Sequence, residues 1–97
     1  MIVVIQSKNG VIDTSKITKV TTNKEGGIYA TCENNTRETL ASYDNLKVAK
    51  FALGMYASAL AGDEHIFYFP NNEEVKSKMT LRRNNVSKTA ANSHGGS

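Results

Sequence analysis

Apolar and polar positions alternate in this chain with two different periods. From 17 to 43 the period is two residues, which is typical of strands with one buried face. Gly26-Gly27 and Asn34-Asn35 interrupt this pattern, because glycine and asparagine tolerate the positive φ of tight turns. A continuous β-branched run near the start, ended by Lys8-Asn9-Gly10, predicts a buried strand. The pattern therefore predicts an antiparallel meander, with strands at 2–7, 17–23, 28–33 and 37–43.

The period becomes that of a helix between Asp44 and Gly62. The side chains of Asp44-Asn45 can accept hydrogen bonds from the free N–H groups of the first turn, and good helix formers follow as far as Ala61. Gly62 is the residue type expected after the last turn. An aromatic run at 65–69 predicts a last strand that ends at Pro70. The expected fold is α+β: a four- to five-stranded, mainly antiparallel sheet with one long helix packed on one face.

This helix carries more apolar surface than one sheet can cover. At 100° per residue its polar side chains occupy a stripe only about 80° wide. The face expected to enter the core consists of Leu46, Ala49, Leu53, Tyr56, Ala57 and Leu60. A surplus remains beside that face, and it consists of Val48, Phe51, Met55 and Ala59.

Three explanations fit the surplus. Residues 73–80 or the chain beyond them fold back over Phe51 and Met55, or the sheet curls around the helix. Alternatively, two copies of the chain associate through this surface, or it is a docking face for a different protein. Exposed Phe, Met and Val are costly unless something covers them, and Met adapts well to partners. Val48, Phe51, Met55 and Ala59 are therefore the candidate protein-interface residues, with a protein partner or a second copy of the chain as the expected occupant.

Charge is unevenly divided along the 97 residues. Residues 1–74 hold seven Lys or Arg and nine Asp or Glu, whereas 75–97 hold five basic residues and no acid. This division predicts a compact α+β domain at 1–74 and a basic, flexible C-terminal tail at 75–97. The tail suggests an alternative function, a nucleic-acid-binding accessory protein that contacts phosphates weakly and without sequence preference. The residues for that alternative are Lys76, Lys78, Arg82 and Arg83.

The residue types that carry chemistry form no recognised constellation. Cys32 is the only cysteine, which excludes an internal disulfide and suits a reducing cytosol. Neither His65 nor His94 belongs to a cluster with zinc spacing, and no glycine-rich phosphate loop occurs. No apolar run approaches the length of a membrane span. We therefore expect a cytoplasmic protein that is not an enzyme, with no metal, cofactor or membrane partner.

Three segments together resemble a known group of sequences. They are Leu40-Ala41-Ser42-Tyr43-Asp44-Asn45, Gly62-Asp63-Glu64 and Ile66-Phe67-Tyr68-Phe69-Pro70. Over residues 1–71 the chain resembles small, mostly uncharacterised proteins of Gram-positive bacteria and their phages, in which a Tyr-Asp strand end precedes a capped helix and an aromatic strand closed by Pro. Those proteins usually have a more charged helix, and this difference argues against a plain monomer.

The resemblance implies no catalytic residues. It implies a phage or mobile-element origin, and hence a location in the bacterial cytosol or the phage-infected host. Small binding proteins of that origin often disable a host enzyme or defence complex. The expected function is thus a non-enzymatic protein-interaction module, either an inhibitor of that kind or a homo-oligomer assembled through its helix.

Overall fold

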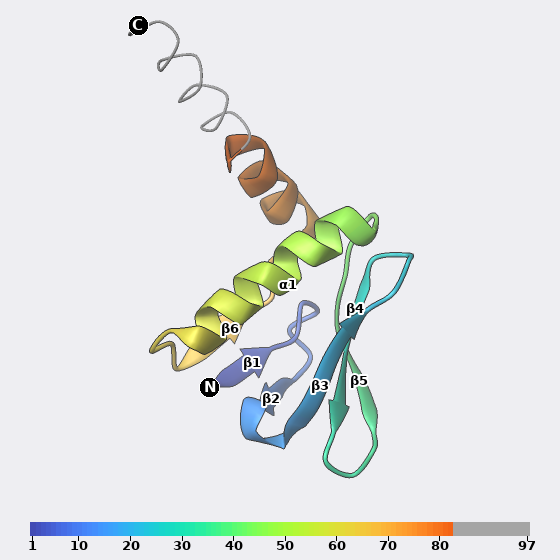
Figure 1. The fold of residues 1–97 in the computed structure, drawn as a ribbon, viewed down its shortest axis with the longest axis vertical. Coiled ribbons are helices and arrows are strands. Elements are labelled where there is room, and N and C mark those ends of the chain that lie inside the picture. Colours follow the sequence, from blue (N-terminus) through green and yellow to red (C-terminus); the bar gives the residue numbers. More distant parts are fainter. Residues whose placement is uncertain (83–97) are drawn as a thin grey trace, which may run out of the picture.

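The computed structural model describes residues 1–82, which form two three-stranded sheets and two α-helices (Figure 1). The sheet with strand order β2-β1-β6 consists of Ile2–Val4 (β1), Val11–Asp13 (β2) and Ile66–Tyr68 (β6). The sheet with order β3-β4-β5 consists of Ile17–Thr22 (β3), Gly27–Cys32 (β4) and Arg37–Ser42 (β5). The helices are α1 (Leu46–Ala61) and a C-terminal helix, described here over 72–82. A 3-10 turn, η1 (Thr14–Lys16), connects the two sheets.

The α+β class is confirmed, but the predicted single sheet of four to five strands under one helix is wrong. The meander β3-β4-β5 is antiparallel as expected. β1 does not join it and pairs antiparallel with β2 and parallel with β6. In the parallel pair Val3 lies opposite Phe67, 64 residues further along the chain. The local pattern of a sequence does not reveal a pairing over such a separation.

The side chain of Gln6 joins the two sheets. Its Oε1 accepts a hydrogen bond of 2.9 Å from the backbone N–H of Ser42, at the end of β5. Its Nε2 donates one of 3.1 Å to the carbonyl of Pro70, just after β6. The backbone N–H of Gln6 also donates to the carbonyl of Leu40 at 2.8 Å. One residue therefore links the end of the meander to the carboxyl ends of the parallel strands β1 and β6.

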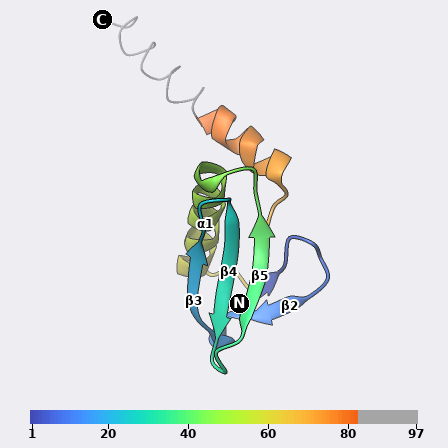
Figure 2. The ribbon, with the colours of Figure 1, turned by 90° about the vertical axis from the view of Figure 1, so that its right-hand side faces the viewer.

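The core lies between α1 and the sheets (Figures 1 and 2). The ring of Tyr56 on α1 stacks on Phe69 with 5.6 Å between centroids and meets Phe67 edge-on at 5.7 Å. Aromatic pairs of this geometry stabilise a core beyond the area that they bury. The buried apolar residues are Val3, Ile28, Ala30, Leu40, Ala41, Tyr43, Val48, Ala49, Ala52, Tyr56, Phe69 and Val75.

The start of α1 is confirmed, but the face that it buries differs from the prediction. Asn45 is the N-cap, and its Oδ1 accepts a hydrogen bond of 3.0 Å from the N–H of Val48. The helix residues in the core are Val48, Ala49, Ala52 and Tyr56, whereas Ala57 and Leu60 of the predicted face are exposed. The buried face is rotated toward Val48 because α1 contacts residues of both sheets.

The C-terminal helix occupies the first part of the segment where a flexible tail was predicted from residue 75. It begins with a capping box in which the Glu74 N–H donates to Asn71 Oδ1 at 2.8 Å and the Asn71 N–H donates to Glu74 Oε1 at 3.5 Å. Val75 is fully buried, and Met79 packs against the core. The boundary expected after residue 74 therefore lies inside a packed helix, and the compact part of the chain includes Val75 and Met79. The remainder of the predicted tail, 83–97, lies outside the described residues.

Candidate functional site

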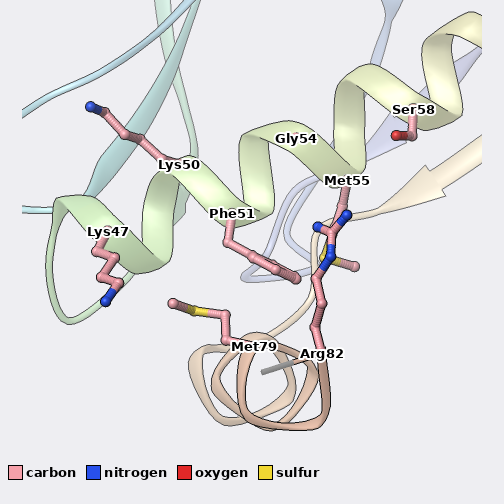
Figure 3. A pocket seen from close by; sticks show the side chains of 8 residues that line it. All are labelled: Lys47, Lys50, Phe51, Gly54, Met55, Ser58, Met79 and Arg82. Carbon is pink, nitrogen blue, oxygen red and sulfur yellow. The ribbon is translucent and has the colours of Figure 1, made fainter. Parts of the chain in front are cut away.

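A groove of about 540 Å³ lies between α1 and the C-terminal helix (Figure 3). The side chains from α1 recur every three or four residues, so they share one face of that helix. Opposite them, the C-terminal helix contributes two side chains. The lining residues are Lys47, Lys50, Phe51, Gly54, Met55 and Ser58 from α1, with Met79 and Arg82 from the C-terminal helix.

The floor of this groove is apolar and incompletely covered. Phe51, Met55 and Met79 are each half-buried, and in Figure 3 their side chains lie between the two helices. The guanidinium carbon of Arg82 lies 5.8 Å from the centroid of the Phe51 ring, within the range of a cation–π contact. Methionine side chains adapt their shape to a partner. The floor can therefore accept further apolar side chains without rearrangement of the fold.

The charged groups around this floor are all positive. Lys47, Lys50 and Arg82 line the groove, and among residues 1–82 no Asp or Glu does. Both lysines are solvent-exposed, and α1 contains no acidic residue. An apolar surface with a cationic rim favours ligands that combine apolar and anionic groups.

Gly54 lies in the middle of this surface, and α1 itself gives no reason for a glycine there. Glycine in a helix interior costs about 0.5–1 kcal/mol relative to alanine. A Cβ built on Gly54 would meet nothing within 4 Å, so no atom of the described chain requires its absence. The effect of this glycine is open space on the face of α1 that lines the groove.

Only two of the four predicted interface residues, Phe51 and Met55, line the groove. Val48 is 4% exposed and belongs to the core, so it is not on the surface where the sequence placed it. Ala59 is half-buried and does not line the groove. The first of the three explanations accounts for part of the surplus, since Met79, from the 73–80 segment, lies opposite Phe51 (Figure 3).

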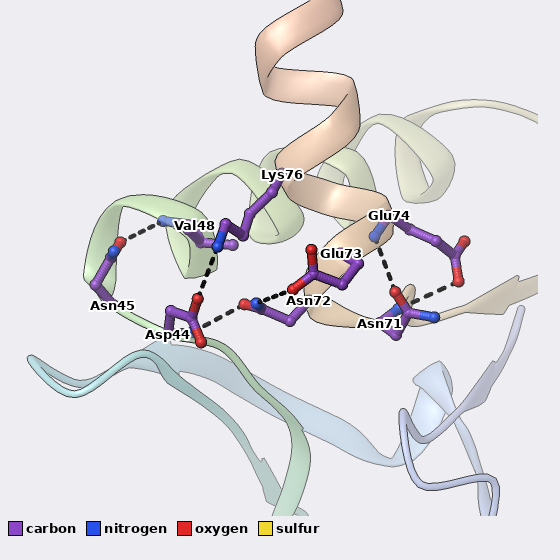
Figure 4. A network of polar contacts seen from close by, with 8 residues as sticks. All are labelled: Asp44, Asn45, Val48, Asn71, Asn72, Glu73, Glu74 and Lys76. Carbon is purple, nitrogen blue, oxygen red and sulfur yellow. Dashed lines mark hydrogen bonds and ion pairs between the residues drawn. The ribbon is translucent and has the colours of Figure 1, made fainter.

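A polar clasp, formed by Asp44, Asn72 and Lys76, holds the C-terminal helix against the start of α1 (Figure 4). Lys76 Nζ lies 3.0 Å from Asp44 Oδ2, and the Asp44 N–H donates to Asn72 Oδ1 at 2.9 Å. Hydrogen bonding with Asn72 and then with Lys76 lowers the pKa of Asp44, and bonding to Asp44 raises that of Lys76. The clasp thus joins the first turns of the C-terminal helix to the residues that precede α1.

The three cations of the nucleic-acid hypothesis that the structure describes do not form one continuous track. Lys76 is paired with Asp44. Lys78 is exposed and, two residues from Lys76, lies on a different face of the helix. Arg82 lies at the groove beside Phe51, and Arg83 is outside the described residues. The described cations thus favour the groove over a phosphate-binding face on the C-terminal helix.

A second apolar surface, not anticipated from the sequence, is the outer face of the sheet β2-β1-β6. Val11 and Tyr68 are 63% and 60% exposed, and both lie opposite Val4 in the register. Ile66 lies on the same face, opposite Ile2. Each strand is only three residues long, about 10 Å. This face is too small to hold a stable interface by itself.

Within residues 1–82 no three His, Cys, Asp or Glu side chains come together as the ligands of a metal ion would. Cys32 is half-buried on β4, beside a shallow hollow of about 370 Å³ that Lys16 and Glu38 also line. No helix in this part of the chain has the length and apolar character needed to cross a membrane.

Comparison with known proteins found no matching family model, no similar curated protein and no similar solved structure. The resemblance to small phage and Gram-positive proteins therefore stays a prediction. The geometry of the groove is therefore the basis for inferring a function.

Met79 and Arg82 form one wall of the groove, but Met79 was not among the predicted site residues and Arg82 was predicted to contact nucleic acid instead. Two features of the sequence indicate a helix in this segment: the capping-box spacing of Asn71 and Glu74 and the four-residue spacing of Val75 and Met79. The absence of acids after residue 74 made this segment look like a solvated tail. A short apolar stripe within a basic segment was sufficient to form a packed helix.

Proposed function

We propose that this chain is a non-enzymatic protein-interaction module that binds a protein partner in the groove between α1 and the C-terminal helix. The observation that supports this is the floor of Phe51, Met55 and Met79, which the described part of the C-terminal helix leaves only half-buried. Open apolar surface of this kind is costly unless a partner covers it. An inhibitor of a host enzyme or defence complex, encoded by a phage, is the form of module that the sequence resemblance favours.

The length of the groove suits a peptide segment of the partner. The α1 residues that line it extend from Lys47 to Ser58, a rise of about 16 Å at 1.5 Å per residue. This corresponds to about three helical turns. A groove between two helices with apolar anchors on its floor is a recurrent way of binding a partner's segment.

A different protein is a better partner than a second copy bound groove to groove. Such a pair would bring Lys47, Lys50 and Arg82 of one chain toward the same cations of the other. Like charges across an interface cost free energy and suppress that pairing. Association of two copies through α1 is therefore the alternative, and the experiment described next distinguishes it from binding of a different protein.

The test uses a side chain that fills the groove without disturbing the fold. Gly54→Gln places a helix-compatible side chain where no atom of residues 1–82 lies within 4 Å of the new Cβ. Ala57→Gln introduces the same side chain at an exposed helix position that does not line the groove. Peptides are selected from a random display library on the full chain, and their affinity for the three proteins is then measured.

We expect selected peptides to bind the wild type and Ala57→Gln equally and to bind Gly54→Gln at least tenfold more weakly. Peptides that bind all three proteins alike would overturn the proposal, because the groove would not be their site. A molar mass of two chains in the wild type, reduced to one by Gly54→Gln, would replace the foreign partner with a second copy.

A further inference from the structure

We infer that the segment bound in the groove is an acidic amphipathic α-helix, an inference that rests on the proposed function. The first reason is the charge of the groove. Its three ionisable lining residues, Lys47, Lys50 and Arg82, are all cations at neutral pH. Because no carboxylate from the described part of the chain lines the groove, we expect the partner to supply the anionic groups.

The arrangement of these cations matches a helix with acids on both flanks. In Figure 3, Lys47 and Lys50 lie toward one end of the floor, and Arg82 rises on the other side of Phe51. The lysines also lie in the first turns of α1, where the helix dipole adds positive potential. Asp44, the acid nearest to this end in sequence, is held in the ion pair with Lys76. Its charge is therefore partly offset.

The second reason is the open space at Gly54. A mid-helix glycine with nothing near its missing Cβ leaves the backbone of α1 accessible. Ser58, one turn further on, is also small and exposed. Small residues one turn apart allow the backbone of a second helix to approach closely. Phe51 and Met55 then flank this track and contact the apolar face of the incoming helix.

These features define the partner's chemistry. The partner helix has a stripe of three or four apolar side chains over about three turns, and these side chains pack on Phe51, Met55 and Met79. Asp or Glu residues flank the stripe and face Lys47, Lys50 and Arg82. Rim charges of this kind act mainly on the association rate and on its salt dependence.

The experiment uses a display library of 16-residue peptides in an alanine-rich helical host. Four positions on one face are randomised among apolar residues, and four flanking positions are drawn from Glu, Gln and Lys. Selection is done on the full chain in 50 mM salt. The selected peptides are measured against the wild type, Gly54→Gln and the double variant Lys47→Glu/Lys50→Glu. The matched control Lys19→Glu/Lys24→Glu makes the same change of charge at exposed lysines outside the groove.

We expect Glu at the flanking positions of the selected peptides. Their affinity should fall at least tenfold with Lys47→Glu/Lys50→Glu and should change little with Lys19→Glu/Lys24→Glu. It should also fall severalfold between 50 and 300 mM salt. Peptides with the flanking Glu residues changed to Lys should bind the groove variant better than the wild type.

Two different failures are distinguishable. Peptides that lose binding to Gly54→Gln but carry Gln or Lys at their flanks, with no dependence on salt, would overturn the acidic helix and leave the groove as a binding site. Peptides that bind Gly54→Gln as well as the wild type would overturn both proposals. The Glu residues introduced at 47 and 50 lie in the first turns of α1, where acids favour the helix, so loss of folding does not explain a loss of binding.

Discussion

The hydroxyl of Tyr43 donates a hydrogen bond of 2.7 Å to the carbonyl of Pro70, 27 residues further along the chain. Tyr43 lies between β5 and α1, and Pro70 lies between β6 and the C-terminal helix. The same carbonyl also accepts from Gln6 Nε2. The connection between β5 and α1 and the connection between β6 and the C-terminal helix are thus joined by hydrogen bonds at one buried carbonyl group. This point supports the elements that form both walls of the groove.

Removal of this hydroxyl should destabilise the protein moderately. We expect Tyr43→Phe to lower the free energy of unfolding by about 0.5–1.5 kcal/mol, because the Pro70 carbonyl keeps its bond from Gln6. Tyr68→Phe is the matched control, since Tyr68 is 60% exposed and has no corresponding partner among the described residues. Urea unfolding of the three proteins measures both effects. Equal losses in the two variants would contradict the role assigned to the Tyr43–Pro70 bond.

The stability of the wild type should also fall in alkaline solution. Burial raises the pKa of Tyr43 above its ordinary value of 10. The folded state therefore resists ionisation that the unfolded chain undergoes, so stability is fully present below pH 10 and is lost as the pH rises above it. Tyr43→Phe should make this alkaline loss of stability smaller. Part of the loss should remain in the variant, because burial also raises the pKa of Tyr56. A wild-type-minus-variant difference that stays constant from pH 8 to 11 would refute this.

The same substitution should have opposite effects at two glycines. Gly26 has φ of 101°, and an added Cβ would lie 2.5 Å from the Tyr43 carbonyl oxygen and 2.8 Å from that of Asn45. Gly26→Ala should therefore lower the free energy of unfolding by about 2 kcal/mol or more. Gly54→Ala should raise it by about 0.5–1 kcal/mol, because the new methyl group meets nothing. Thermal and urea unfolding compare the two, and destabilisation by Gly54→Ala would show that α1 itself requires this glycine.

A chain that ends at residue 74 should fold poorly. It lacks Val75, which is fully buried, and Met79, which packs against the core. Loss of these two side chains should remove about 3 kcal/mol or more, a large share of the 5–15 kcal/mol typical of a domain. A chain that ends at residue 82 is the matched comparison. Equal unfolding midpoints for the two chains would restore the boundary expected from the charge pattern.

The elements set by nearby residues could be predicted from the sequence. The meander follows from two short turns, and α1 begins at the cap that Asn45 predicts. The division into two sheets could not be predicted, because it depends on the pairing of β1 with β6 and on hydrogen bonds between Gln6 and residues 36 and 64 positions away. No periodicity within either segment encodes these contacts.

The candidate site could be predicted only in part, for a related reason. The excess apolar surface of α1 was visible in the sequence, and Phe51 and Met55 are two of its residues. The orientation of α1 about its own axis, between the two sheets, decides which of these apolar residues stay exposed. In the orientation observed, Val48 lies in the core. The opposite wall depends on Val75 and Met79, two apolar residues in a segment whose charge suggested a solvated tail.

The position of β1 between β2 and β6 also affects how the chain folds during its synthesis. Until Ile66–Tyr68 leaves the ribosome, β1 has a partner on only one side, and its other edge is available for pairing with any extended segment. The nascent chain must therefore wait for the last quarter of the described sequence before its first strand is protected. Incomplete translation products would expose this edge, and we expect them to be aggregation-prone and quickly degraded.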